Sequence, residues 1–499
     1  MRIVLPTLHV RRSAQAVPLA AGCLKAALPE PLRAQAQLLD LFPEQSDQSM
    51  LQAILASEPK LVAFSLYVWN RRRVCGLARQ LRSARPAIKL VAGGPEVFAD
   101  SQAVLSEGGF DGVILGEGEE TFAELALRLA RGAELEPSAG LVLAEQGGAG
   151  EAPSPSPAPD LGRLPSPWLE GAVAPTDAGG VLWETSRGCP FNCTFCFDGR
   201  GSRGTRLLPL ARLEKELELF VRRQVSQVWV LDSTFNHPPE RGKKLLKLLA
   251  RKAPHIHFHL EAKADFLDRE TARLLAKLSC SVQIGLQSAR PEVLRKIHRS
   301  LDPEQFAQKI QLLAREGVTY GLDLIYGLPG DDFSGFCRSL NYAFGLAPNH
   351  IDIFPLAVLP GTVLHREAAD HGLRAQLEPP YEILESATMS AADLDACRLL
   401  AASADLFYNT GRAVAFFAAL LKVAGCDAVS FLRGFAAWLL AEQKVSHEAL
   451  LASERWMPAE ALPLQEAYVA FLFKKQKQAD LLPAAQDLLR YHFHYAETL

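Results

Sequence analysis

Three cysteines share one short segment of the chain, RGCPFNCTFC. They are Cys189, Cys193 and Cys196. Gly188, Pro190 and Asn192 favour a tight loop, which can bring three thiolates onto one centre. A zinc site usually has a fourth Cys or His at close spacing, whereas the nearest histidine here is His237. Three thiolates suit a 4Fe-4S cluster with one iron left open, which can bind a small chelating ligand and pass it an electron.

The cysteine segment directly follows a predicted strand, and residues 179–375 alternate strands with helices. The predicted strands are VLWETS, QVWVLDS, IHFHLEA, SVQIGLQ, TYGLDLIYG and IDIFPL. Amphipathic stretches such as LARLEKELELFVRRQ and DPEQFAQKIQLLAREG lie between them as helices. Six such units are enough for most of a parallel barrel, so this region predicts a partial (β/α)6 barrel.

Residues 1–145 show the same alternation with a shorter period. The predicted strands are MRIVLP, KLVAFSLYV, IKLVAGG, FDGVILG and GLVLAE. Strands that are apolar on both faces, with helices between them, indicate a Rossmann-like parallel sheet covered on both sides. Ligands of such sheets bind beyond the carboxyl ends of the strands.

Composition limits the remaining classes of protein. The chain has 499 residues, a formal net charge of −3 and 48% hydrophobic residues, which excludes a general nucleic-acid-binding footprint and dominant disorder. We expect no transmembrane helix and no signal peptide, and nine scattered cysteines favour a reducing cytoplasm.

Residues 146–178 are rich in Pro, Gly and Ser and predict a linker that cannot build a core. Residues 376–499 predict an all-helical C-terminal domain.

The cysteine spacing C-x3-C-x2-C, with Phe195 before the last cysteine, resembles the signature of radical SAM enzymes. The wording ETSRGCPFNCTFC is similar to the branch with an N-terminal cobalamin-binding domain, and the resemblance covers residues 1–375. It implies that S-adenosylmethionine (SAM) chelates the open iron through its amino and carboxylate groups. One electron then cleaves SAM to methionine and a 5′-deoxyadenosyl radical, while the protein positions the cofactors.

The resemblance also implies which residues contact SAM. They are Phe195, Asp232, Ser233, Thr234, Asn236, Glu261, Gln287, Ser288, Arg299 and Ile325. The turn that begins at Asp232 departs from the family's glycine-rich form, although it offers carboxylate, hydroxyl and amide oxygens. Asp323 and Gly330 stand where the adenine-side motif usually has Gly and Glu, so we expect only backbone and Ile325 contacts there.

Three motifs at strand ends of the first region predict the cobalamin site. Their residues are Ser65, Tyr67, Trp69, Asn70, Gly93, Gly94, Pro95, Glu96, Gly116, Glu117, Gly118 and Glu119. Glycines there let the backbone approach a bulky ligand. The Asp-x-His-x-x-Gly motif that supplies a lower axial histidine is absent, and His9 is interpreted as a loop residue. We therefore expect cobalt without a histidine ligand from the protein.

The sequence thus predicts a cytoplasmic, cobalamin-dependent radical SAM enzyme that methylates a carbon of a small-molecule substrate and needs an electron donor. The cobalt would face the open iron across a cavity between the first two domains, with the helical domain closing that cavity. The absence of a second cysteine triplet argues against methylthiolation. Three alternatives stay open: a non-methylating radical cyclisation or rearrangement, a non-catalytic cobalamin-binding sensor, and a zinc-binding nucleotide-fold protein. Substrate identity and oligomeric state are not predicted.

Overall fold

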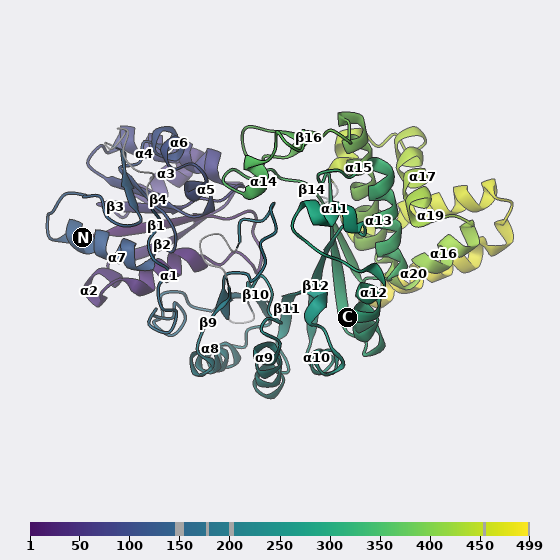
Figure 1. Ribbon diagram of the computed structural model, residues 1–499, viewed down its shortest axis with the longest axis horizontal. Helices are drawn as coiled ribbons and strands as arrows, with labels where there is room; N and C mark the ends of the chain where they lie inside the picture. The colour runs from purple at the N-terminus through teal and green to yellow at the C-terminus, as the bar shows by residue number, and fades with distance from the viewer. Residues whose placement is uncertain (145–153, 176–178, 199–203, 453–455, 498–499) are drawn as a thin grey trace.

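Two six-stranded sheets form the frame of the molecule, and a group of helices extends it beyond the second sheet (Figure 1). The computed structural model describes residues 1–144, 154–175, 179–198, 204–452 and 456–497. In Figure 1 the N-terminal sheet lies at the purple end, the second sheet lies in the middle, and the C-terminal helices lie at the yellow end.

The N-terminal sheet has the strand order β2-β1-β3-β4-β5-β6. Its strands are β1 (Ile3–Leu8), β2 (Ala36–Leu41), β3 (Leu61–Ser65), β4 (Lys89–Gly93), β5 (Gly112–Ile114) and β6 (Leu141–Leu143). Its helices are α1 (Leu19–Ala27), α2 (Glu30–Arg33), α3 (Asp47–Leu55), α4 (Arg71–Ala84), α5 (Pro95–Ala99), α6 (Ser101–Gly108) and α7 (Glu119–Ala130). Separate clusters of buried apolar side chains cover its two faces, as the continuous apolar strands predicted. The strand order reverses between β1 and β3, which is where such sheets bind ligands.

Two details of this sheet differ from the expectation. Residues Ala36–Leu41 form an edge strand that the sequence analysis did not include. The sheet is also not wholly parallel, because β6 pairs with β5 in the antiparallel direction. Helix α7 returns the chain to the amino edge of the sheet, and residues 131–140 contain no further helix. Ten such residues can span the height of the sheet, so the chain enters β6 from the carboxyl edge.

The second sheet confirms the partial (β/α)6 barrel. Its strands are β7 (Gly180–Trp183), β10 (Gln227–Val230), β11 (His257–Ala262), β12 (Cys280–Gln287), β13 (Thr319–Tyr326) and β14 (His350–Pro355). They neighbour one another in chain order, and every pairing is parallel. The helices between them are α8 (Leu210–Arg222), α9 (Pro239–Lys252), α10 (Arg269–Leu275), α11 (Pro291–Lys296), α12 (Pro303–Arg315) and α13 (Phe333–Gly345). A short antiparallel pair, β8 (Ser186–Arg187) and β9 (Arg206–Leu207), follows β7.

The barrel strands owe their two faces to alternation of residue type. In β11, Phe258, Leu260 and Ala262 are buried, while His259 and Glu261 lie on the opposite, more open face. Period-two alternation of this kind places one set of side chains on each face of a sheet. The open face therefore carries the polar side chains of the strands, and their ends hold the predicted site.

The predicted linker is partly built into the core. Within the described residues 154–175, Leu161, Leu164, Trp168 and Val173 are buried in the same apolar cluster as the barrel. Trp168 packs edge-on against Phe220 of α8, with ring centroids 5.4 Å apart. The expectation that this composition cannot contribute to a core is therefore wrong for this stretch, because four large apolar residues lie among the prolines. Residues 145–153 and 176–178 of the predicted linker lie outside the described residues.

The C-terminal region is helical, as predicted. It contains α15 (Ala391–Ala404), a π-helical segment (Asp405–Thr410), α16 (Phe417–Ala424), α17 (Ala428–Ala441), α18 (His447–Leu451), α19 (Pro458–Lys475) and α20 (Leu482–Glu497). Its buried side chains belong to the same apolar cluster as the barrel. Asn409 covers the edge of β14, accepting from the Ile351 N–H at 3.1 Å and donating to the Ile351 carbonyl at 2.9 Å. The region is thus packed onto the barrel through a shared core.

Among the described residues, we find no individual helix whose length and apolar character would let it cross a membrane. Helices α16 and α17 pass this test as a pair, with a bend of 86° between them. Phe417, Leu420, Phe431 and Leu432 of that pair are buried in the core.

Candidate active site at the strand ends

The cysteine loop (residues 188–196) follows β7, and backbone hydrogen bonds hold it in place. The Thr194 N–H donates to the Ile297 carbonyl at 3.2 Å, and the Thr194 carbonyl accepts from the Leu364 N–H at 2.9 Å. Leu364 lies in α14 (Val363–Arg366), so the loop is held between the end of α11 and a segment that follows the barrel. Cys189, Cys193 and Cys196 stay partly exposed, and all nine cysteines of the chain are free thiols.

The donor set of this loop fits a 4Fe-4S cluster with one open iron. Burial, reinforced by the neighbouring thiols and Asp198, raises the pKa of Cys189, and the same causes raise the pKa of Cys196 to about 11. Among the described residues, no three His, Cys, Asp or Glu side chains are placed to hold one metal ion. A cubane does not need that spacing, because each thiolate binds a different iron. Thr194, next to Cys193 in the sequence, is fully buried, and its hydroxyl lacks a hydrogen-bond partner within the described residues.

The Asp232 carboxylate fastens the strand that leads into the cysteine loop. It accepts from the Thr185 N–H at 2.7 Å, from the Ser186 N–H at 3.0 Å and from both hydroxyls. Burial raises the pKa of Asp232, while these bonds oppose the shift. Its predicted contact with SAM stays a prediction, since four protein donors already meet the carboxylate.

The neighbouring turn residues also contact the protein. Asn236 pairs with the backbone of Lys263, accepting from its N–H at 3.1 Å and donating to its carbonyl at 2.9 Å. The Thr234 hydroxyl donates to the Ser233 carbonyl at 2.6 Å. Ser233 is half-buried in this turn. Phe195 is half-buried and packs against the apolar core.

Glu261 and Gln287 are the predicted residues that the protein leaves most available. The Glu261 carboxylate meets solvent at the open face, yet the protein packed around it, together with Asp323 and Asp198, raises its pKa to about 7. Gln287 is 9% exposed, has φ of 61°, and its amide oxygen has no partner among the described residues. Its amide lies over Gly285, where an added Cβ would come within 2.7 Å of the amide nitrogen.

The other predicted SAM contacts lie near these two. Arg299 donates to the Gly285 carbonyl at 2.7 Å. The Ser288 hydroxyl lies 3.2 Å from that of Ser339, and Ile325 is buried near the end of β13.

Lys263 is a residue that the sequence analysis did not identify. It follows β11, its ammonium lies 3.3 Å from the centroid of the Phe191 ring in the cysteine loop, and burial lowers its pKa. Its position two residues after Glu261, at the same strand end, is the signal that could have indicated it. The structure thus places the Lys263 ammonium within electrostatic reach of the Cys189 and Cys193 thiols, and 3.8 Å from the Asp265 carboxylate.

The predicted cobalamin residues follow β3, β4 and β5, at the carboxyl edge of the N-terminal sheet. Asn70 closes the first loop, accepting from the Tyr67 N–H at 2.8 Å and donating to the Ser65 carbonyl at 3.1 Å. The rings of Tyr67 and Trp69 stack with centroids 4.5 Å apart, and Trp69 is 55% exposed. This loop therefore presents an aromatic surface at the strand ends.

The second loop is locked from a distant part of the chain. Gly94 has φ of 106°, and an added Cβ would lie 2.6 Å from the Leu66 carbonyl oxygen, so only glycine fits. Glu96 is buried and meets Arg71 at 3.3 Å and the Tyr381 hydroxyl at 2.7 Å. Tyr381 lies between β15 (Arg374–Ala375) and β16 (Ile383–Glu385). The strand β16 is labelled in the green part of the chain in Figure 1. Gly93 and Pro95 flank these residues, at the end of β4 and the start of α5.

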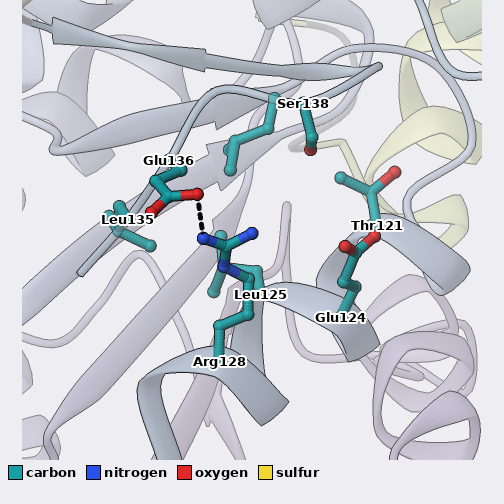
Figure 2. A pocket seen from close by; sticks show the side chains of 8 residues that line it. Thr121, Glu124, Leu125, Arg128, Leu135, Glu136 and Ser138 are labelled. Atoms are coloured by element: carbon teal, nitrogen blue, oxygen red, sulfur yellow. Dashed lines mark ion pairs between the residues drawn. The ribbon is translucent and has the colours of Figure 1, made fainter. Parts of the chain in front are cut away.

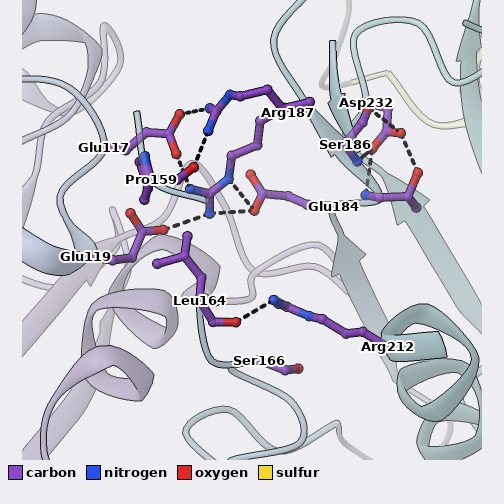
Figure 3. A network of polar contacts seen from close by, with 12 residues as sticks. Glu117, Glu119, Pro159, Leu164, Ser166, Glu184, Ser186, Arg187, Arg212 and Asp232 are labelled. Atoms are coloured by element: carbon purple, nitrogen blue, oxygen red, sulfur yellow. Dashed lines mark hydrogen bonds and ion pairs between the residues drawn. The ribbon is translucent and has the colours of Figure 1, made fainter. Parts of the chain in front are cut away.

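The third loop, residues 116–119, reaches the barrel through ion pairs (Figure 3). Arg187 meets Glu117 at 2.8 Å, Glu119 at 2.7 Å and Glu184 at 2.9 Å. Arg206 also pairs with Glu117. Gly116 has φ of 90°, and an added Cβ at Gly118 would lie 3.3 Å from Leu24 of α1. We call residues 116–119, which the sequence predicts to contact cobalamin, the corrinoid loop.

His9 follows β1 and is engaged within the sheet. Its Nε2 lies 2.7 Å from Asp40, and its ring stacks on Phe42.

A shallow pocket lined by Thr121, Glu124 and Arg128 of α7 and by Glu136 lies outside the predicted site (Figure 2). An ion pair between Arg128 and Glu136 crosses it.

Comparison with known protein families agrees with this geometry. Residues 183–343 match the radical SAM superfamily, and residues 10–126 match the B12 binding domain. A radical SAM domain and a B12-binding domain are thus both found in this chain. These two domains imply a 4Fe-4S cluster, SAM and cobalamin as cofactors, as the sequence predicted.

Two curated relatives and one solved structure illustrate the similarity. The cobalamin-dependent radical SAM methyltransferase TokK of Streptomyces tokunonensis is 29% identical over 66% of this chain and 51% of its own length. The 2-(S-pantetheinyl)-carbapenam-3-carboxylate methyltransferase of Streptantibioticus cattleyicolor is 30% identical over 64% of this chain and 50% of its own length. The chain therefore spans about half the length of these relatives.

The solved structure extends the likeness to the C-terminal helices. The cobalamin-dependent SAM radical enzyme OxsB, with aqua-cobalamin and SAM bound, has a TM-score of 0.67 and 13% identity. It covers 99% of this chain and 84% of OxsB. This likeness concerns the fold, and it includes the helical region beyond the barrel.

Proposed function

We propose that this chain is a cobalamin-dependent radical SAM methyltransferase that acts on a carbon of a small-molecule substrate. The observation that carries the proposal is the cysteine loop: it holds three free thiols after the first barrel strand, and Arg187, directly before it, forms ion pairs with a strand-end loop of the B12-binding domain. Both curated relatives above are named methyltransferases, which supports methyl transfer over another radical outcome.

We assign different roles to the residues at the carboxyl end of the barrel. Cys189, Cys193 and Cys196 hold the cluster, and no fourth protein ligand is required of the chain. When bound, the cluster supplies an electron to SAM and the corrinoid supplies a methyl group. Glu261 and Gln287 offer oxygen acceptors on the open face, and Lys263 offers a cation for the SAM carboxylate. The other predicted contacts complete this end of the barrel.

The cobalamin side presents a different surface. The aromatic pair Tyr67 and Trp69 and the backbone at Gly93 lie at the strand ends, where a bulky ligand can approach. We expect the corrinoid to contact that surface, with no histidine ligand to cobalt, since the ring of His9 is paired with Asp40. The segment that holds Tyr381 and Leu364 contacts both sides and would help to enclose the substrate.

The proposed setting is the cytoplasm, with a separate protein or small molecule as electron donor. Nine free cysteines and an oxygen-sensitive cluster favour a reducing compartment. The domain boundaries near residues 145, 178 and 375 remain part of this proposal.

The test is product analysis without added substrate. The chain is reconstituted anaerobically with iron, sulfide and hydroxocobalamin, then incubated with SAM and a titanium(III) reductant. We expect both S-adenosylhomocysteine and 5′-deoxyadenosine, and we expect Cys193→Ala to produce neither while it still binds the corrinoid. 5′-Deoxyadenosine without S-adenosylhomocysteine would instead indicate cyclisation or rearrangement. Neither product from cluster-loaded protein would indicate a cobalamin-binding sensor, and stoichiometric zinc in colourless protein would indicate a zinc site.

A further inference from the structure

Arg187 connects the two halves of the proposed site. It lies two residues before Cys189, in β8, and its guanidinium reaches Glu117 and Glu119 of the corrinoid loop (Figure 3). Arg187 also contacts Glu184 on its own side, at 2.9 Å and 3.1 Å. One side chain therefore spans from the strand that leads into the cysteine loop to the loop after β5.

The β8–β9 pair strengthens this connection. Arg187 and Arg206 face each other in its register, and both meet Glu117. Arg206 also donates to the Pro159 carbonyl at 2.9 Å. Glu119 is the first residue of α7, where the helix dipole favours an acidic side chain. The corrinoid loop is thus held from the barrel side by two arginines.

Burial makes this contact stronger than an ordinary surface ion pair. The side chain of Arg187 is 17% exposed and that of Glu119 is 8% exposed. Exposed pairs contribute little to stability, whereas a shielded guanidinium that bridges several carboxylates has a defined geometry. Removing Arg187 would leave Glu117 paired with Arg206 but would take this partner from Glu119 and Glu184, so these two carboxylates would move apart.

We infer that Arg187 is a positioning residue that holds the corrinoid loop against the cysteine loop and thereby fixes the separation between the corrinoid and the cluster. This inference rests on the proposed function, because it assigns those two cofactors to those two loops. Arg187 itself holds neither cofactor. Its part is to transmit the position of one loop to the other.

A second connection between the same two domains limits what loss of Arg187 can do. Tyr381 holds Glu96 and Arg71 of the N-terminal region, and Leu364 of the same segment holds Thr194 in the cysteine loop. The domains therefore stay joined without Arg187. The expected effect is a looser separation of the cofactors rather than separation of the domains.

The experiment uses the full chain loaded with both cofactors and reduced to cob(II)alamin and the one-electron-reduced cluster. Iron, sulfide and cobalt are quantified first. Pulsed EPR then measures how strongly the cluster enhances the relaxation of cob(II)alamin, which reports their separation and its spread. We expect one narrow distribution in the wild type, at least a twofold broader one in Arg187→Gln, and an intermediate one in Arg187→Lys, which keeps the charge but not the fork.

Arg212→Lys is the matched control. Arg212 is also 17% exposed and pairs with a buried glutamate, Glu216, at 2.9 Å, but this pair lies within α8. We expect wild-type relaxation from it. A role limited to general stability would predict equal effects in the two lysine variants.

The outcomes separate the inference from the proposed function. Wild-type protein that takes up no corrinoid or no cluster overturns both. Wild-type protein that holds both cofactors, with unchanged relaxation in Arg187→Gln, overturns the inference alone. If Arg187→Gln loses its cluster, Glu119→Gln tests the same bridge from the far side, and wild-type relaxation in that variant would also overturn it.

Discussion

The carboxyl ends of the two sheets use their polar side chains differently. At the N-terminal sheet, Asn70, Glu96 and Glu119 are engaged by other parts of the protein. At the barrel, no hydrogen bond or ion pair within the described residues holds the Glu261 carboxylate, and the Gln287 amide oxygen has no partner there. We therefore expect side chains to bind SAM, whereas backbone and aromatic surface bind the corrinoid.

This difference shows two roles for a polar residue at a strand end. It either binds a ligand or forms hydrogen bonds and ion pairs that hold the surrounding loops in place. Buried carboxylates are found with partners because an unpaired buried charge is costly. Glu96 and Glu119 meet that requirement through protein partners. Glu261 has no protein partner among the described residues and meets solvent at the open face, so its carboxylate is available to a ligand.

The largest effect should come from removing a frame residue at the barrel side. Asp232→Ala leaves the four donors of Thr185 and Ser186 without their acceptor, which should lower the free energy of unfolding by about 3 kcal/mol. Because these residues lead into the cysteine loop, iron uptake should fall as well. Urea unfolding and iron analysis measure the two effects.

The control for this prediction is Ser233→Ala, at the next position. It should change the free energy of unfolding by less than about 0.5 kcal/mol. An Asp232→Ala protein with wild-type stability would contradict the role of this carboxylate in holding the strand that leads into the cysteine loop.

A smaller effect should follow from weakening the frame at the N-terminal sheet. Tyr381→Phe removes a hydroxyl that donates to Glu96 and accepts from Arg71 at 3.0 Å, so the free energy of unfolding should fall by about 1–2 kcal/mol. Corrinoid affinity should weaken too, since Glu96 follows the loop at Gly93. Tyr342→Phe, whose hydroxyl bonds to the Pro303 carbonyl within the barrel, should leave corrinoid affinity unchanged. Equal affinity losses in both variants would contradict this role of Glu96.

The smallest effect concerns pH. The folded protein raises the pKa of Glu261 from 4.5 to about 7, so it retains a proton that the unfolded chain releases. This contribution to stability is complete below pH 4.5 and is lost as pH rises through 7. Because Glu261 meets solvent, the loss should be no more than about 1 kcal/mol.

Glu261→Gln should therefore reduce the fall in stability between pH 5 and pH 8, measured as urea midpoints. Glu304→Gln, at an exposed position in α12, should keep the wild-type dependence. If Glu261→Gln also kept the wild-type pH dependence, the carboxylate would have a partner in the protein. The contrast between the two sheets would then lose its main example.

Local patterns were sufficient to predict most of the fold. The six barrel strands were predicted because their outward residues, such as Val282 and Ile284, alternate with open-face residues. The direction of β6 was not predicted, because it depends on how residues 131–140 cross the sheet edge. The packing of Trp168 was not predicted, because composition does not show which element an apolar side chain packs against.

The candidate site was predictable only where its residues lie close together in the sequence. The cysteine loop is one segment, so its spacing alone identified it. The engagement of Glu96 was not predictable, because its partner Tyr381 lies 285 residues away. Arg187 stands in the same motif as the cysteines, yet its partners come from a separate sheet.

The most direct test of the central claim is EPR of the reduced, iron-sulfide-reconstituted protein with and without SAM, alongside iron and sulfide counts. We predict about four irons and four sulfides per chain and a changed cluster spectrum when SAM is added, because SAM binds the iron that Cys189, Cys193 and Cys196 leave open. A cluster whose spectrum does not respond to SAM, or a fourth cysteine or histidine found on the cluster, would contradict the account.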